Sequence, residues 1–385
     1  MNPIFAELPT TIFEEISGKA RAVGAVNLGQ GFPEAPGPED VRAKAADALL
    51  HGYNQYPPMA GLPELRAAVA EHYRRFQGLE FQPEQVLVTS GATEAIAASI
   101  LALIQPGDEV VLIQPFYDAY PPLVRQAGGV IRFVSLKPPE WRLTEEALAA
   151  AFGPKTRLVI FNNPMNPAAR VFDAAECELL AAFCRRFDVT AVCDEVWEHV
   201  IFDGRAHIPL IGLPGMAERT VKIGSAGKMF SLTGWKVGFV CAAPRLLAAI
   251  AKAHQFLTFT TPPNLQAAVA YGLGKDAAYF AGMRAEYQHG RDRLAAALVD
   301  GGWAVLPSEG AYFLCVDLDA SGVAADDLTF CRRAVTEAGV GAIPVSVFYA
   351  EAPVTNVVRL CFAKSDATLD AGAERLNAAR KMFGR

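Results

Sequence analysis

The chain has 385 residues, of which 52% are hydrophobic and 20% are charged. This composition is typical of a globular protein with two domains, or one large α/β domain with an appendage, and not of a disordered chain. The formal net charge of −6 gives no general attraction to nucleic acid or to an anionic membrane, so we exclude both as primary partners.

The first 45 residues mix apolar and polar side chains and contain the turn-rich segment Leu28–Pro33. We expect them to form an N-terminal arm and a first helix that contribute part of a small domain. Residues 1–13 contain Glu7 and no basic side chain, so we expect no signal peptide. No apolar run approaches the ~18 residues that are needed to span a bilayer.

From residue 86 onward, short β-rich runs recur, and helical stretches lie between most of them. The runs are residues 86–89, 109–113, 131–136, 157–161, 189–193, 219–223 and 236–240. Apolar runs that are separated by helices indicate a mostly parallel sheet covered on both faces. We therefore predict an α/β fold with a mostly parallel seven-stranded sheet. Its last two strands should be antiparallel, because they are too close for a crossover helix.

Two of the helical stretches are residues 93–104 and 174–187. Asp173 followed by Glu176 predicts a capping box at the start of the second stretch. A longer helical region follows at about residues 263–300.

Beyond this region the pattern predicts a smaller α+β domain. Strand-like runs at 303–305, 311–317 and 356–362 alternate with helices near 326–338 and 366–382. We expect three parts: an N-terminal arm with part of the small domain (1–45), a large cofactor-binding domain (46–275) and a C-terminal small domain (276–385).

Polar and flexible residues follow the predicted strands where ligands usually bind, beyond the carboxyl ends of an open parallel sheet. They are Ser90–Thr93, Gln114–Tyr117, Asn162–Pro167, Asp194–Glu195 and Gly224–Lys228. The strand ends thus combine an anion cradle, an aromatic ring, amides, a carboxylate and a lysine.

Each of these groups suits the chemistry of pyridoxal 5′-phosphate (PLP). The free N–H groups of a helix that starts at Gly91 would bind the phosphate. Asp194 would keep the pyridine nitrogen protonated, and the Lys228 amine would bond to the aldehyde. Ser225 and Lys236 would add donors to the phosphate. The order and spacing of the whole set carry this interpretation, because each member alone is a common turn or surface residue.

Other chemistries are not supported by the motifs. Met229 after Lys228 and the glycine spacing argue against a phosphate-binding P-loop. The sequence contains no Gly-x-Ser-x-Gly elbow, and the spacing of its six histidines predicts no catalytic metal. The seven cysteines form no Cys-x-x-Cys pair, so we interpret them as reduced thiols of a cytoplasmic protein.

At these residues the sequence resembles the class I/II aminotransferases of PLP fold type I. It is similar to the branch that contains kynurenine aminotransferase, glutamine transaminase K and methionine aminotransferases. The motifs are VNLGQGFPE (26–34), NQY (54–56), NNPMNPAARVF (162–172), CDEVWEHVIFDG (193–204), IGSAGKMFSLTGWKVGF (223–239) and VVRLCFA (357–363).

The resemblance implies a homodimer with shared active sites and a role for each matching residue. Lys228 would carry the cofactor and move the proton, and Asp194 would pair with the ring nitrogen. Further cofactor contacts are implied for Gly91, Ala92, Thr93, Tyr117, Asn166, Ser225, Lys236 and, in the neighbouring subunit, Tyr56. Arg359 would clamp the substrate α-carboxylate, with help from Gly31 and Asn166.

The sequence departs from the family pattern at two places. Trp197 stands where the family usually has a tyrosine that binds the cofactor 3′-oxygen. The usual Asn-Pro-Thr-Gly reads Asn166-Pro167-Ala168-Ala169.

The sequence does not identify the amino-acid substrate. Phe13, Tyr117 and Phe259 are expected to line the side-chain pocket, which favours aromatic, methionine or glutamine side chains. A cysteine-S-conjugate β-lyase and a succinyldiaminopimelate-type aminotransferase are the alternatives.

Overall fold

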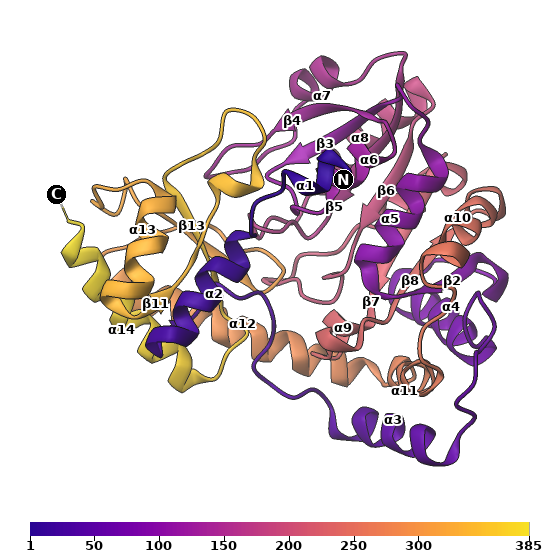
Figure 1. The fold of residues 1–385 in the computed structure, drawn as a ribbon, viewed down its shortest axis with the longest axis horizontal. Helices are drawn as coiled ribbons and strands as arrows, with labels where there is room; N and C mark the ends of the chain where they lie inside the picture. The colour runs from indigo at the N-terminus through magenta and orange to yellow at the C-terminus, as the bar shows by residue number, and fades with distance from the viewer. Residues whose placement is uncertain (385) are drawn as a thin grey trace.

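The seven predicted strands form one sheet in the computed structural model, which describes residues 1–384. The strand order is β2-β8-β7-β6-β5-β3-β4 (Figure 1). β8 runs antiparallel to both of its neighbours, as predicted for the last pair, and the other pairs are parallel. The strands are β2 (Val86–Thr89), β3 (Glu109–Gln114), β4 (Val130–Ser135), β5 (Thr156–Asn162), β6 (Thr190–Asp194), β7 (Thr220–Ser225) and β8 (Gly238–Ala242).

Helices cover both faces of this sheet, and all of its strands except β4 are buried over most of their length. One face packs on α5 (Gly91–Leu103), α6 (Tyr120–Gln126) and α10 (Pro244–Leu257). The opposite face packs on α4 (Pro63–Gln77), α7 (Glu145–Ala151) and α8 (Ala174–Phe187). The capping box predicted for α8 is present, with Asp173 and Glu176 each accepting the other's backbone N–H.

The C-terminal part of the chain forms a four-stranded antiparallel sheet with the order β12-β13-β10-β9. Its strands are β9 (Ala304–Val305), β10 (Phe313–Asp317), β12 (Ile343–Pro344) and β13 (Val357–Cys361). The helices here are α13 (Asp327–Arg333) and α14 (Asp366–Met382). α13 is shorter than the predicted helix 326–338, because residues 334–338 form a π-helical turn that ends at Gly339 in the left-handed conformation.

The long helical region predicted at 263–300 is two helices. α11 (Pro263–Leu273) ends before α12 (Ala277–Asp300), and the side chain of Asp276 caps the start of α12. α12 extends toward the C-terminal elements in Figure 1. Neither α12 nor any other helix within residues 1–384 is long and apolar enough to cross a membrane.

The N-terminal elements pack in two different places. They are α1 (Pro3–Ala6), α2 (Ile12–Val23), β1 (Val26–Asn27) and α3 (Glu39–His51). β1 pairs with β11 (Val340–Gly341), and α2 packs beside it near the C-terminal elements, whereas α3 packs on α11 (Figure 1). The expected packing of residues 14–45 on the small domain therefore does not extend to α3. The domain limits near residues 45 and 275 stay a prediction.

Candidate active site

A cavity of about 390 Å³ lies at the carboxyl ends of the parallel strands. The expected site residues that line it are Phe13, Gly31, Gly91, Ala92, Thr93, Tyr117, Asn166, Asp194, Trp197, Ser225, Lys228, Lys236 and Arg359. A larger hollow of about 710 Å³ lies between residues 33–38 and α12, but it contains none of them. The smaller cavity is therefore the candidate active site, because the chemistry converges there.

Asp194 is the buried carboxylate of the cavity, and it ends β6. Its Oδ2 accepts a hydrogen bond of 2.6 Å from the Tyr120 hydroxyl. Its Oδ1 is buried and has no partner among the described residues. Burial raises the pKa of Asp194, and the Tyr120 hydrogen bond partly offsets this effect. A buried carboxylate oxygen without a donor is costly, and a cationic N–H that enters the cavity would satisfy it.

Lys228 lies in the short helix α9 (Ala226–Met229), directly after β7. Its Nζ donates to the Tyr312 hydroxyl at 2.9 Å and lies 5.1 Å from the centre of the Trp197 ring. Burial lowers the pKa of Lys228 to about 8, although the charge of Asp194 opposes this shift. The amine is therefore much easier to deprotonate near neutral pH than an ordinary lysine, which suits a nucleophile and proton carrier.

Arg359 is a guanidinium that is 1% exposed, on β13. Its Nη1 donates to Asn166 Oδ1 at 2.6 Å and its Nη2 to the Gly29 carbonyl at 2.9 Å, while its Nε has no partner. Burial lowers its pKa to about 10. No carboxylate within residues 1–384 forms an ion pair with it, so an anionic ligand would supply the missing charge.

The start of α5 faces the same cavity and is suited to an anion. The first N–H groups of a helix lack partners within the helix, and no side chain caps this one. Gly91 has φ of +74°, and a Cβ there would lie 3.3 Å from Lys236 Nζ, so glycine lets the lysine approach the helix start. Ser225 also lines the cavity.

Aromatic rings form much of the remaining wall. Phe13 comes from α2, Tyr117 from the segment after β3, and Phe313 from β10. The Arg359 guanidinium lies 4.1 Å from the centre of the Phe313 ring. Trp197 contributes its indole, whose buried N–H finds no acceptor with hydrogen-bonding geometry among residues 1–384.

Two predicted site residues lie outside this cavity. Tyr56 is 81% exposed and Phe259 is 40% exposed, and their rings contact each other edge to face at 5.6 Å. Phe259 therefore does not line the pocket of its own chain, contrary to expectation. Its position after α10 places it at the surface beside Tyr56.

Three residues of the site were missed by the sequence interpretation. Tyr120 binds Asp194, and Tyr312 binds Lys228. Asn162 donates from Nδ2 to the backbone carbonyl of Asp194 at 2.8 Å. Asn162 was visible as an amide at a strand end, whereas the two tyrosines contact residues 74 and 84 positions away, and no local pattern reveals such contacts.

Glu195 follows Asp194 but belongs to a separate buried cluster. Lys222 contacts both Glu195 and Glu198, and His207 contacts Glu195 at 3.0 Å. Burial opposes ionisation of Glu195, but its interactions with Lys222 and His207 together outweigh this effect and lower the pKa of Glu195 to about 2. The carboxylates of Glu195 and Glu198, with His207, have the spacing of metal ligands, but the Lys222 ammonium already supplies their cation.

The residues of the cavity fit PLP on three observations of the structure. The unpartnered Asp194 Oδ1 matches a protonated ring nitrogen, and the Lys228 amine matches the aldehyde. The uncapped start of α5 with Lys236 beside it matches the phosphate.

Comparisons with known proteins show the family of this chain. The family described as "Aminotransferase class I and II" matches residues 23–376. The chain is 45% identical to "Probable N-succinyldiaminopimelate aminotransferase DapC" of Mycobacterium tuberculosis, with 96% of both chains covered. It is 40% identical to "Methionine aminotransferase" of Escherichia coli over 96% of both chains, and 36% identical to human "Kynurenine--oxoglutarate transaminase 1" over 91% of both.

A solved structure of N-succinyldiaminopimelate aminotransferase from M. tuberculosis superposes with a TM-score of 0.94. It is 44% identical in sequence and covers 98% of this chain and 99% of its own. The chain therefore belongs to the class I and II aminotransferases, which are PLP-dependent enzymes of fold type I.

Proposed function

We propose that this aminotransferase acts on L-amino acids with aromatic, methionine-like or glutamine-like side chains and passes their amino group to a 2-oxo acid. The observation that carries the proposal is the wall of the cavity. Its cations are Lys228, Lys236 and Arg359, and each has a role that the cofactor or the α-carboxylate requires. The remaining wall combines aromatic and aliphatic side chains with neutral polar ones and offers no further cation among the described residues, which favours a substrate side chain without a negative charge.

We propose the following cofactor contacts. Lys228 would bond the aldehyde, Asp194 Oδ1 would accept from the ring nitrogen, and the Tyr117 ring would stack on the cofactor. Gly91, Ala92, Thr93, Ser225 and Lys236 would hold the phosphate, and Asn166 and Trp197 would lie near the 3′-oxygen. Bound PLP supplies an electron-withdrawing ring that takes up the electron pair left when the substrate Cα loses its proton.

Arg359 would bind the substrate carboxylate through a fork of two N–H donors. Its bonds to Asn166 and to the Gly29 carbonyl fix the plane of the guanidinium before the substrate arrives, and its free Nε remains available. Gly31 leaves room beside the guanidinium for the carboxylate, because a Cβ at this position would lie 3.0 Å from the Phe313 ring and 3.6 Å from Arg359 Nη2.

Lys228 Nζ would take the proton from the substrate Cα and deliver it to the cofactor C4′, and in the second half of the reaction it would carry a proton in the opposite direction. A base near its operating pH does this best, and the lowered pKa of about 8 meets that condition. The half-buried position of Lys228 also limits exchange of this proton with solvent.

One other substrate class and one other reaction remain as alternatives. The relative that is 45% identical carries the name N-succinyldiaminopimelate aminotransferase, and a substrate of that type has distal carboxylates. Such a substrate would need a cation for its distal carboxylates, and the three cations of this cavity already have other proposed roles. A cysteine-S-conjugate β-lyase would use the same cofactor contacts and would release pyruvate and ammonia.

A donor panel tests the proposal. The purified enzyme would be assayed with methionine, phenylalanine, kynurenine, glutamine, aspartate and N-succinyl-L,L-diaminopimelate against several 2-oxo acids. We expect the highest kcat/KM with the first four donors. A clear preference for aspartate or the succinylated donor would contradict the substrate class. Pyruvate and ammonia formed without an amino-acid product would indicate the lyase reaction.

We also propose a homodimer with shared active sites. Tyr56 and Phe259 form an exposed aromatic pair outside their own cavity, and Phe256 nearby is 85% exposed. In the dimer, Tyr56 would reach the partner's phosphate and Phe259 would line the partner's pocket. Sedimentation velocity tests the oligomeric state.

We further propose a cytoplasmic location. All seven cysteines are buried and free, which suits a reducing compartment. Cell fractionation tests the location.

A further inference from the structure

Tyr312 contacts Lys228 but has no role in the proposed cofactor or substrate contacts. It is fully buried and directly precedes β10. Its backbone is fixed on two sides, because Phe362 N donates to the Tyr312 carbonyl at 3.0 Å and Ala311 N donates to the Val200 carbonyl at 2.9 Å. The ring is therefore held between the segment that follows Asp194 and the end of β13.

The hydrogen bonds of Tyr312 have a defined direction. Its hydroxyl donates to the Gly31 carbonyl at 3.0 Å, and a carbonyl can only accept. The single phenolic proton is thus used, so the oxygen can only accept from Lys228 Nζ at 2.9 Å. Burial raises the pKa of Tyr312, which keeps the phenol neutral over the working pH range.

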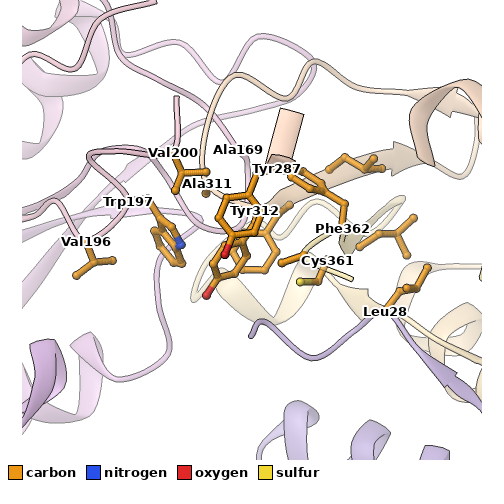
Figure 2. Packing of buried hydrophobic residues seen from close by; sticks show 14 of the residues in the cluster. Leu28, Ala169, Val196, Trp197, Val200, Tyr287, Ala311, Tyr312, Cys361 and Phe362 are labelled. Carbon is orange, nitrogen blue, oxygen red and sulfur yellow. The ribbon is translucent and has the colours of Figure 1, made fainter. Parts of the chain in front are cut away.

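The Lys228 amine has few contacts other than its hydrogen bond to Tyr312. Its amine lies over the face of Trp197, and the Trp197 and Tyr312 rings meet edge to face at 5.6 Å (Figure 2). No other hydrogen bond of Lys228 Nζ is found within residues 1–384, so Tyr312 alone fixes the direction of the amine by a hydrogen bond. The titratable groups that affect the charge of Lys228 are Asp194 on β6 and Cys361 and Arg359 on β13, with Lys236 beyond α9.

We infer that Tyr312 is a positioning residue of the transamination reaction, which holds the free amine of Lys228 and links it to the Gly31 segment beside the substrate carboxylate site. The inference rests on the proposed role of Lys228. The amine is free whenever substrate occupies the cofactor, and it must then point at the substrate Cα. A hydrogen bond to a neutral, fixed acceptor orients the amine without supplying a competing proton.

The direction of the hydrogen bond gives a test with a definite sign. A phenol oxygen that only accepts stabilises the ammonium form more than the amine form, so its removal lowers the pKa of Lys228. A phenol that donated to the amine would have the opposite effect. We expect Tyr312→Phe to lower the Lys228 pKa by roughly half to one unit, since a hydrogen bond to a charged group is worth more than one to a neutral group.

The measurement is competitive labelling of the cofactor-free, full-length protein. Trace acetic anhydride is applied between pH 6 and pH 11, and the modification of Lys228 is quantified by mass spectrometry to give its pKa. Tyr287→Phe is the matched control, because Tyr287 is a buried phenol whose ring lies 5.8 Å from Tyr312 and whose hydroxyl bonds to Ser231 instead (Figure 2). Thermal unfolding of both variants controls for general loss of stability.

The second measurement uses the loaded enzyme. In Tyr312→Phe we expect kcat to fall about tenfold or more, with a smaller rise in KM, and the acid limb of the kcat profile to move to lower pH. The control should retain the wild-type profile. An unchanged or raised Lys228 pKa in Tyr312→Phe, or an equal shift in Tyr287→Phe, would overturn the inference. Full transamination in Lys228→Ala would instead overturn the proposed role of the lysine.

Discussion

Replacement of Arg359 by lysine tests how the substrate carboxylate is bound. Lysine keeps the positive charge but offers one ammonium in place of a planar fork. The structure gives Arg359 two fixed bonds, to Asn166 and to Gly29, and an unpartnered Nε for the ligand. Loss of one charge-assisted hydrogen bond costs about 1.5–3 kcal/mol. Since each ~1.4 kcal/mol is tenfold, kcat/KM for the amino acid should fall about 10- to 100-fold.

The assay is steady-state kinetics with methionine or phenylalanine at saturating PLP and 2-oxo acid. We expect most of the loss in KM, because the carboxylate is bound in the ground state as well as in the transition state. Arg293→Lys is the matched control, since Arg293 lies on the surface and pairs with Asp370. PLP affinity, measured by quenching of tryptophan fluorescence, should not change. An effect confined to PLP affinity would show that Arg359 contacts the cofactor, and an unchanged kcat/KM would refute the clamp.

Three further predictions concern the other side of the cavity. Asp194→Asn should lower kcat by about 100-fold or more while PLP affinity changes much less, because the carboxylate acts mainly on charge that develops in the transition state; an intact kcat would refute this role. Cofactor-free Lys228→Met should be more stable than the wild type at pH 7, by up to about 3 kcal/mol, because the buried amine has a pKa of about 8 against 10.5 when unfolded. Because this folded pKa is depressed, the unfolded state binds more protons, and the wild type loses stability as pH falls from 10.5 to 8. Urea unfolding should therefore show a smaller difference in unfolding free energy between variant and wild type at pH 10.5 than at pH 7. A difference that does not change with pH would contradict the assignment. Trp197→Tyr should lower the pH midpoint of the visible absorbance change of the loaded enzyme, because a phenol is a better donor to the cofactor oxygen than an indole; an unchanged midpoint would mean that the indole already supplies an equivalent donor or points away.

The sequence suggested those site residues whose chemical type and position near a strand end are informative. Lys228, Asp194 and Asn166 each follow a buried strand, and parallel strands bring their carboxyl ends to one edge of the sheet. The positions of the strands were also predictable, since all seven predicted runs begin within two residues of the observed starts. Apolar runs bounded by glycine and polar residues leave little freedom for such strands.

The remaining features depend on contacts between distant segments. Tyr120 begins α6 and Tyr312 precedes β10, and their hydroxyl groups contact Asp194 and Lys228, which are far away in the sequence. No local pattern reveals such contacts. Phe259 has the residue type expected for a substrate pocket, but the sequence does not say whether it lies in the cavity or at the surface. The π-helical turn at 334–338 follows α13 and ends at Gly339, which is in the left-handed conformation. Helix periodicity does not reveal this interruption.

The most direct test of the account is to locate the cofactor on the chain. The purified enzyme would be reduced with borohydride, digested and mapped by mass spectrometry, with Lys228→Ala treated in parallel. The account predicts a phosphopyridoxyl group on the peptide that contains Lys228 and none on the variant. The same group on Lys236 or another lysine, or an unmodified wild-type protein that still transaminates, would contradict the assignment of Lys228 as the residue that carries PLP.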